Sequence, residues 1–158
     1  MILILFRHGE AEEVEAGRSE ALRGLTPEGV TANARSIRAI ERAGLRPDLI
    51  AHSPLARAAQ TAEAAAEILK PPGGVRADPR LAGGAGVDEV RGIAADYPGD
   101  ALMLVGHNPD LSLIAGLLIG GGQLALKTSG VACVSLPVVE PGAGRLEWLI
   151  QPALCASG

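Results

Sequence analysis

The chain has 158 residues, of which 47% are apolar and 20% are charged, and this is the composition of a folded globular protein rather than a disordered one. Its net charge of -4 and its scarcity of aromatic residues, limited to Phe6, Tyr97 and Trp148, argue against a surface that tracks or stacks on nucleic acid. We therefore expect a single domain over residues 1–158 that has no nucleic acid as a partner.

Cysteine usage and hydropathy bear on where the protein works. Cys133 and Cys155 form neither a disulfide framework nor a metal-ligand pattern. The apolar run Met1–Phe6 is too short for the core of a secretory signal and lacks a basic region before it. Glycines interrupt the apolar stretch Leu111–Leu126, which suits a buried helix and a loop better than a membrane span. We expect a cytoplasmic protein with no membrane partner.

The first predicted elements are a strand and a helix. Residues Ile2–Phe6 are apolar without a break, which is typical of a central strand that is covered on both faces. Thr26 and Pro27 have the residue types of an N-cap and a first helical position, so they predict the start of a helix. This helix should run to about Ala43, with Gly44 as its stop signal.

A second strand and helix follow in the same order. Residues Asp48–Ala51 are predicted as a strand. Ser53 before Pro54 indicates another N-cap, and the alanine-rich segment up to Leu69 is strong helix-forming sequence. The alternation of strands with helices predicts an α/β fold around a mostly parallel sheet.

The second half of the chain begins with a segment rich in proline and glycine. Residues Pro71–Gly86 should form a long surface connection that contains a short edge strand near Val75–Ala77. The elements predicted after it are a helix over Asp88–Asp96, an apolar strand that starts at Ala101 and ends before His107, a helix from Asn108 and Pro109 to Ile119, and two strands, Val131–Leu136 and Arg145–Ile150, joined as a hairpin.

Basic and imidazole side chains follow three of the predicted strands. Arg7 and His8 follow the first strand, the segment His52–Arg57 follows the second, and His107 follows a later one. Ligands of open parallel sheets bind at the carboxyl ends of the strands, so we expect these side chains to share one crevice. Guanidinium groups bind phosphoryl oxygens and a neutral imidazole can attack phosphorus. The crevice therefore suits a phosphoryl group.

Four motifs carry a resemblance to a known family. They are "RHGEAE" at Arg7–Glu12, "RGLTPEG" at Arg23–Gly29, "SPLARAAQTAE" at Ser53–Glu63 and "VGHNPDLS" at Val105–Ser112. In order and spacing they resemble the histidine phosphatase superfamily with its RHG motif, and most closely its SixA-type branch of phosphohistidine phosphatases. The resemblance covers essentially the whole chain. It implies a three-layer α/β/α sandwich with a mostly parallel central sheet, like that of phosphoglycerate mutases.

The resemblance also implies roles for individual residues. His8 matches the nucleophile that becomes phosphorylated, and Arg7 beside it matches a phosphate ligand. Arg57 matches the second arginine of the pocket. His107 matches a second histidine that binds phosphoryl oxygen and stabilises the transition state. Arg23 matches an arginine near the pocket of the short members, and neither a metal nor a cofactor is implied.

The chain departs from larger relatives at the place of their general acid. Those relatives take a carboxylate from the segment after the second strand and helix, but no carboxylate lies near Leu81–Gly83. Asp88 and Glu89 are candidates, although both also suit the first turn of a helix. A phosphorylated imidazole leaves with less help than an alkoxide does, and the chain lacks long insertions that could enclose a metabolite. These features predict hydrolysis of phosphohistidine on a protein, such as a phosphotransfer domain.

Several other functions fit the same residues. The chain could be a small-molecule phosphomonoesterase of the same superfamily with a small phosphorylated substrate, a mutase, or a non-catalytic regulatory module that binds phosphorylated groups. A zinc hydrolase would use His8, His52 and His107, although the two arginines beside them would repel the cation. If no zinc site is formed, His52 is expected to order the turn before Ser53.

Overall fold

The computed structural model describes residues 1–156, and in this part of the chain the strands form one sheet with the order β3-β2-β4-β1-β5-β6. The strands are β1 (Ile2–Arg7), β2 (Leu49–His52), β3 (Val75–Ala77), β4 (Ala101–Gly106), β5 (Val131–Ser135) and β6 (Arg145–Ile150). Four strands, β3, β2, β4 and β1, are parallel, whereas β5 is antiparallel to both of its neighbours. The sheet is thus mostly parallel, as predicted.

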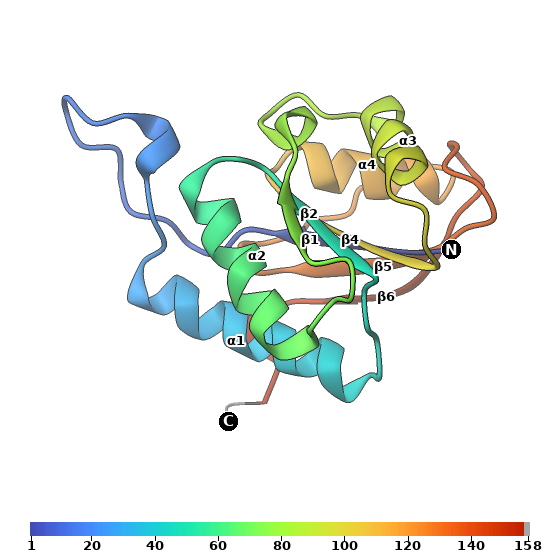
Figure 1. Ribbon diagram of the computed structural model, residues 1–158, viewed down its shortest axis with the longest axis horizontal. Coiled ribbons are helices and arrows are strands. Elements are labelled where there is room, and N and C mark those ends of the chain that lie inside the picture. The colour runs from blue at the N-terminus through green and yellow to red at the C-terminus, as the bar shows by residue number, and fades with distance from the viewer. Residues whose placement is uncertain (157–158) are drawn as a thin grey trace.

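Helices cover both faces of this sheet and complete three layers (Figure 1). One face carries α1 (Pro27–Arg42) and α2 (Ala56–Leu69), and the other carries α3 (Val87–Asp96) and α4 (Asp110–Leu118). Short 3-10 helices lie at Glu20–Leu22 (η1), Pro79–Leu81 (η2) and Pro152–Leu154 (η3). The α/β/α sandwich that the sequence resemblance implies is therefore the observed fold.

Strand β1 shows why its sequence is apolar throughout. Leu3 and Leu5 pack in the core under α3 and α4, whereas Ile4 and Phe6 pack in the core under α1 and α2. All four side chains are fully buried. Burying side chains of this size contributes about 1.5 to 3 kcal/mol each, so the strand anchors both layers at once. The predicted central position of this strand is confirmed.

Helix α1 begins where the sequence indicated. Thr26 is the N-cap, and its hydroxyl accepts a hydrogen bond of 3.0 Å from the Gly29 N–H. Gly29 itself lies against the chain that leaves β1, since a Cβ at this position would come within 2.3 Å of the Glu10 carbonyl oxygen. The start of α1 is thereby packed against the segment that follows the first strand.

The start of helix α2 differs from the prediction. Ser53 does not cap the helix, which begins at Ala56 with Leu55 as the N-cap. The reason is that the Ser53 N–H still bonds the Val105 carbonyl, at 2.9 Å, and so continues the pairing of β2 with β4. The Ser53 hydroxyl oxygen accepts the N–H of Leu55 instead, at 3.2 Å, and its own hydrogen remains available to another side chain.

The other predicted elements lie within one or two residues of their expected positions. The predicted edge strand Val75–Ala77 is β3, and the predicted helix Asp88–Asp96 is α3 with one residue added at its start. The hairpin of the last two strands is present as β5 and β6. Within residues 1–156, the helices are all too short or too polar to cross a lipid bilayer.

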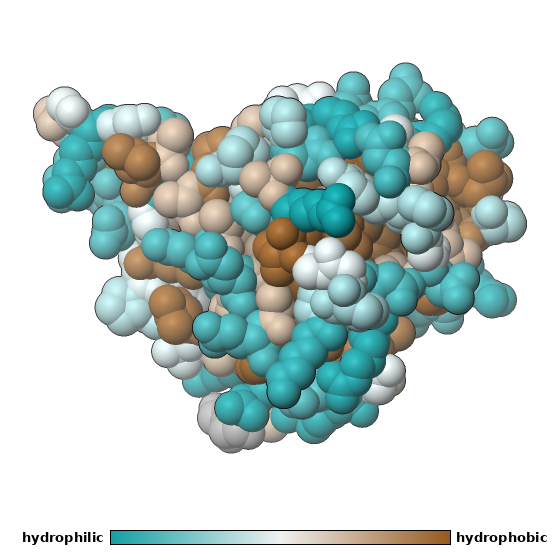
Figure 2. Space-filling model, in the orientation of Figure 1, coloured by the Kyte–Doolittle hydropathy of each residue, from teal (hydrophilic) through white to brown (hydrophobic). Residues whose placement is uncertain are grey.

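The segment between β1 and α1 was not predicted from the sequence. The chain between β1 and α1 makes an excursion, residues 12–24, which projects from the body as a separate lobe (Figures 1 and 2). Its base is closed by a bridge between Ala11 and Leu25 and by a 2.9 Å hydrogen bond from the Glu12 N–H to the Gly24 carbonyl. Val14 and Leu22 are exposed on it. The returning part of the excursion contains η1, which lies near the carboxyl ends of the parallel strands.

Candidate active site

A cavity of about 540 Å³ lies at the carboxyl ends of β1 and β4. The five residues singled out from the sequence all line it, namely Arg7, His8, Arg23, Arg57 and His107. They come from the ends of two strands, from the excursion and from the first turn of α2. The parallel strands place their carboxyl ends at one edge, so residues that are far apart in sequence meet there.

His8 stands at the end of β1 and is 8% exposed. Its N–H bonds the Gly106 carbonyl at 3.0 Å, which continues the pairing of β1 with β4. The imidazole Nδ1 lies 2.7 Å from the Gly9 carbonyl oxygen. A carbonyl can only accept, so Nδ1 carries the proton and the lone pair of the neutral ring is on Nε2.

The surroundings of His8 keep it neutral. Burial lowers the pKa of His8 from 6.5 to about 4, and the nearby charges of His107, Arg57 and Arg7 act in the same direction. The hydrogen bond to Gly9 opposes this shift without overcoming it. At neutral pH the ring therefore has a free lone pair, which a nucleophile requires.

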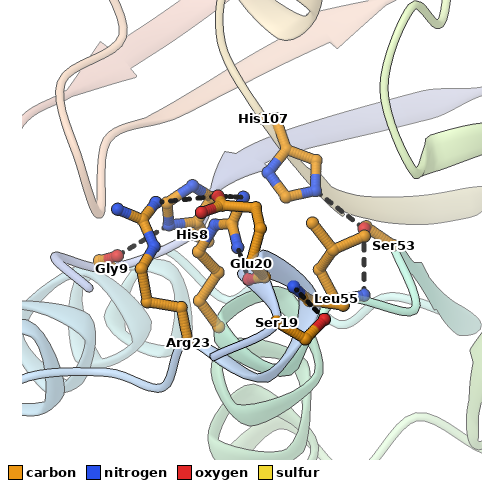
Figure 3. A network of polar contacts seen from close by, with 10 residues as sticks. His8, Gly9, Ser19, Glu20, Arg23, Ser53, Leu55 and His107 are labelled. Carbon is orange, nitrogen blue, oxygen red and sulfur yellow. Dashed lines mark hydrogen bonds and ion pairs between the residues drawn. The ribbon is translucent and has the colours of Figure 1, made fainter. Parts of the chain in front are cut away.

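His107 follows β4 and faces His8. The two ring centroids are 5.0 Å apart, with the planes inclined by 61°. Its Nε2 lies 2.7 Å from the Ser53 hydroxyl, the group that a conventional helix cap would have used (Figure 3). Burial lowers the pKa of His107, and Arg57 adds to this effect. Ser53 is fully buried, so it holds the His107 ring in one orientation.

The arginines supply positive charge to the same cavity. Arg7 donates from Nη1 to the Leu126 carbonyl at 2.8 Å, which fixes its guanidinium. The Nε atoms of Arg7, Arg23 and Arg57 are buried and have no hydrogen-bond partner among the described residues. Buried donors normally have a partner, so these N–H groups suit an oxyanion that brings several acceptor oxygens.

Glu20, from the excursion, contacts two of the arginines. Its carboxylate lies 3.0 Å from Arg57 Nη2 and 3.3 Å from Arg23 Nη2. Its main-chain carbonyl also accepts from Arg57 Nη1 at 3.1 Å. Figure 3 shows the Glu20 side chain beside Arg23. Glu20 was not predicted from the sequence, since an acid in a loop with no periodic pattern gives no signal of its own.

The glycine segment after η2 lines the cavity without offering an acid. Ala82, Gly83 and Gly84 are among its lining residues, in agreement with the missing carboxylate. Asp88 and Glu89 lie outside the lining and have the helix-terminal roles that were the alternative interpretation. Asp88 pairs with an arginine of its own helix at 2.6 Å, and Glu89 accepts an N–H at the start of α3 at 2.7 Å.

Two carboxylates do line the cavity, Glu10, which from the sequence is expected to be a surface or helix-terminus acid, and Asp110, which the sequence did not single out. Asp110 is the first residue of α4 and accepts the Ala85 N–H at 3.0 Å, so it ties the glycine segment to this helix.

Asn108 is a further cavity residue that was not predicted from the sequence to belong to the site. Its amide donates to the Leu126 carbonyl at 2.7 Å, the same oxygen that receives Arg7. The letters "HNPD" after β4 were the only sequence signal for Asn108 and Asp110.

His52 does not join the other histidines. It is absent from the cavity lining, and its Nδ1 lies 2.7 Å from the Ser53 carbonyl, in keeping with the turn-ordering role expected for it. Over residues 1–156, no three side chains of the metal-binding types come together as a candidate metal site. The arrangement that a three-histidine zinc site would need is thus not formed.

The sandwich and its basic, histidine-containing cavity define a class of α/β protein whose pocket suits phosphoryl groups. The family model of the histidine phosphatase superfamily (branch 1) matches residues 3–83, just over half of the chain. The chain belongs to this superfamily of phosphatases. The comparison with curated proteins finds no match.

Solved structures of similar proteins agree with the family. A SixA protein from Agrobacterium tumefaciens is 28% identical, with 96% of this chain and 97% of that chain covered and a TM-score of 0.78. The protein histidine phosphatase SixA in complex with tungstate is 25% identical, with coverage of 97% and 98% and a TM-score of 0.79. An Escherichia coli structure of an alpha-ribazole-5'-P phosphatase, at 19% identity, 100% and 99% coverage and a TM-score of 0.73, shares the fold. The resemblance to the SixA type is confirmed.

Proposed function

We propose that this protein hydrolyses phosphohistidine on a protein through a covalent phosphohistidine formed on its own His8. The observation that carries the proposal is the state of His8, which is buried among cations, depressed in pKa to about 4 and bonded through Nδ1 to a carbonyl. These features leave Nε2 as the free nucleophilic atom at neutral pH. The same features would be of no use to a module that only binds phosphate.

Binding of the phosphoryl group falls to the arginines. In the proposed complex Arg7, Arg57 and Arg23 donate to the three phosphoryl oxygens, and the buried Nε–H groups gain the acceptors that they lack. The carboxylate of Glu20 leaves Arg57 as the substrate arrives, since both are anions that compete for the same donors. No metal is needed for this charge balance, because the guanidinium groups supply the positive charge.

The reaction proceeds in two displacements. Nε2 of His8 attacks phosphorus and the new N–P bond forms. The bond from phosphorus to the substrate imidazole breaks, and this ring leaves as a neutral imidazole because its other nitrogen carries a proton. His107, oriented by Ser53, donates a hydrogen bond to a phosphoryl oxygen as charge develops. Water then attacks the phosphorylated His8, which releases inorganic phosphate and regenerates the neutral ring.

The choice of a phosphorylated imidazole as substrate rests on the glycine segment of the cavity. A general acid is worth about 10²- to 10⁴-fold for a poor leaving group, and residues 82–84 supply none. An imidazole departs more readily, so its loss does not depend on such an acid.

We also infer that the protein is cytoplasmic, because both of its cysteines are free thiols.

A small-molecule phosphomonoesterase is the second candidate, and one observation favours it. Glu10 and Asp110 both line the cavity, so a carboxylate could protonate an alkoxide leaving group from a direction other than the glycine segment. Of the two, Asp110 is held in place by its bond to Ala85, whereas Glu10 is exposed.

Turnover of three substrates at matched concentrations separates these functions. We expect a phosphohistidine peptide and an activated aryl phosphate to be hydrolysed faster than an alkyl phosphate such as glycerol phosphate. Asp88→Asn and Glu89→Gln should leave phosphohistidine turnover nearly unchanged. Faster turnover of the alkyl phosphate, lost about 10²-fold or more in Asp110→Asn or Glu10→Gln, would establish the phosphomonoesterase instead. No turnover of any of the three substrates would identify a binding module.

A further inference from the structure

The peptide bond between His8 and Gly9 is held on both sides by buried groups. The His8 carbonyl accepts the Ser129 N–H at 3.1 Å, and the Gly9 N–H donates to the Thr61 hydroxyl at 3.2 Å. The next carbonyl, that of Gly9, is the one that receives Nδ1 of His8. The main chain that sets the tautomer of His8 is therefore itself fixed by α2 and by the loop before β5.

Asn33, on the buried face of α1, joins the two partners of this peptide. Its Nδ2 donates to the Thr61 hydroxyl at 2.9 Å, and its Oδ1 accepts from the Ser129 hydroxyl at 2.7 Å. Asn33 is 1% exposed, and Thr61 and Ser129 are fully buried. Three segments of the chain thus meet behind His8 through one amide side chain.

The direction of each hydrogen bond in this cluster is determined. The Thr61 hydroxyl donates its single hydrogen to the Arg57 carbonyl at 2.8 Å, so it can only accept from Gly9 and from Asn33. The Asn33 amide must then present nitrogen to Thr61 and oxygen to Ser129. A buried network with every donor and acceptor paired is rigid, whereas a partly paired one is costly.

Two further observations show how closely the cluster fits. A Cβ on Gly9 would lie 2.8 Å from Asn33 Oδ1, so the amide packs directly against the Gly9 main chain. Ser129 has a φ of 61°, a left-handed conformation that is uncommon for a residue other than glycine. The Ser36 hydroxyl, one turn along α1 from Asn33, bonds the Ser129 carbonyl at 2.6 Å and supports this conformation.

We propose that Asn33 is a positioning residue, which acts through Thr61 and Ser129 to aim Nε2 of His8 at phosphorus. This inference rests on the proposed role of His8 as the nucleophile. The hydrogen bond from Thr61 to the Arg57 carbonyl ties the helix turn of a phosphate-binding arginine to the same cluster. Asn33 thereby fixes the position of His8 relative to Arg57.

The test compares Asn33→Ala and Thr61→Val with a matched control. Both variants remove a member of the cluster but leave every group that lines the cavity in place. We expect kcat for an aryl phosphate to fall about 10- to 100-fold with a small change in KM, because a misplaced nucleophile reduces catalysis more than binding. Thr61→Ser, which keeps the hydroxyl, should restore most of the kcat lost in Thr61→Val.

Asp48→Ala is the control for a loss of stability alone. The Asp48 carboxylate accepts the N–H groups of Asp100 and Ala101, at 2.7 and 2.8 Å, at the amino ends of the strands and away from the cavity. Asp48→Ala should lower the thermal midpoint through the loss of these two hydrogen bonds, with kcat retained. Asn33→Ala or Thr61→Val with wild-type kcat, or with a loss no greater than that of Asp48→Ala, would overturn the inference.

Nitrogen-15 NMR of the His8 ring gives a second readout that a purely structural role would not change. We expect a single tautomer with the proton on Nδ1 in the wild type and in Thr61→Ser, and a mixture of tautomers in Thr61→Val. A pure Nδ1–H tautomer in a folded Thr61→Val protein would overturn the inference even if Asn33→Ala fails to fold. The proposed function would fail on a different result, namely the absence of a phosphoryl group on His8 of the wild-type protein during turnover. The two failures are therefore distinguishable.

Discussion

Three properties of His8 determine the protonation state of its imidazole. It is nearly buried, it lies among cationic groups, and its Nδ1 proton is held by a main-chain carbonyl. Burial and positive neighbours both disfavour the imidazolium, so the lone pair on Nε2 is retained in mildly acidic solution. The reactivity of this residue is thus set by its position at the end of a central strand.

The titration of His8 follows from these surroundings. Because its pKa is lowered to about 4, the ring should remain neutral as the pH falls from 7 to 5. We expect an NMR titration midpoint for His8 well below 6.5 and near 4. A midpoint at 6.5 would mean that the ring is hydrated and that its neighbours are not where the structure places them.

The same shift has a consequence for stability. The unfolded chain takes up a proton on His8 near pH 6.5, whereas the folded chain resists it down to about pH 4. The unfolded state therefore binds more protons between these values, and His8 lowers the free energy of unfolding as the pH falls through that window. His8→Ala should remove this contribution.

At this scale the sequence predicted the arginines and histidines of the cavity but not the residues that support them. Arg7, His8, Arg57 and His107 were recognisable because each follows a strand or lies in a motif. Asn33 carried a weaker signal, as a polar residue on the face of α1 that is otherwise turned to the core. A hydrogen-bond partner cannot be read from the sequence when it lies on another element, as Ser129 does.

At the scale of elements, the excursion between β1 and α1 supplies the carboxylate that pairs with two arginines of the cavity. It brings η1 to the cavity, where the Glu20 carboxylate contacts Arg57 and Arg23. The excursion is otherwise largely exposed and meets the body at the bridge between Ala11 and Leu25. An acid on such a segment can leave the arginines at low cost when an anionic substrate binds.

We expect Glu20→Gln to bind tungstate or phosphate more tightly than the wild type, by about 3- to 10-fold, since a neutral amide competes less well than a carboxylate for guanidinium donors. Isothermal titration calorimetry measures this directly. Glu15→Gln is the matched control, because Glu15 lies on the same excursion but pairs with Arg18 and not with Arg23 or Arg57. Weaker binding in Glu20→Gln would show that Glu20 orders Arg57 instead of competing for it.

Most elements could be predicted because their local signals agree with their tertiary roles. Thr26 and Pro27 mark the start of α1 in the sequence and in the structure alike. Ser53 failed as a predicted cap because its backbone is still paired with β4 and its hydroxyl is used by His107. Tertiary contacts override a local capping signal at the site, where the two demands compete.

At the scale of the whole molecule, β1 from the beginning of the chain and β6 from its end lie in the same sheet. We propose on this basis that residues 1–158 function as a single domain. The cavity is assembled from segments between Arg7 and Thr128 that are far apart in sequence, so its integrity depends on the fold that brings them together. A ligand bound in the cavity should accordingly stabilise the whole molecule.

We expect tungstate or vanadate to raise the thermal midpoint of unfolding, by about 5 °C or more at 100 times the dissociation constant, since the anion binds only the folded state. Differential scanning fluorimetry measures the shift, and Arg57→Ala should abolish most of it. EDTA should change neither the midpoint nor turnover. Activity that is lost with EDTA and restored by zinc would contradict a site that works through arginines alone.

The central claim is that His8 carries the phosphoryl group during turnover, and trapping that intermediate tests it most directly. Protein mixed with an aryl phosphate and quenched in alkaline denaturant should carry one phosphoryl group on His8 that is stable to base and labile to acid. His8→Ala should lack the group and lose at least ~10³-fold in turnover. Undiminished turnover in His8→Ala, or a phosphoryl group on another residue, would contradict the account.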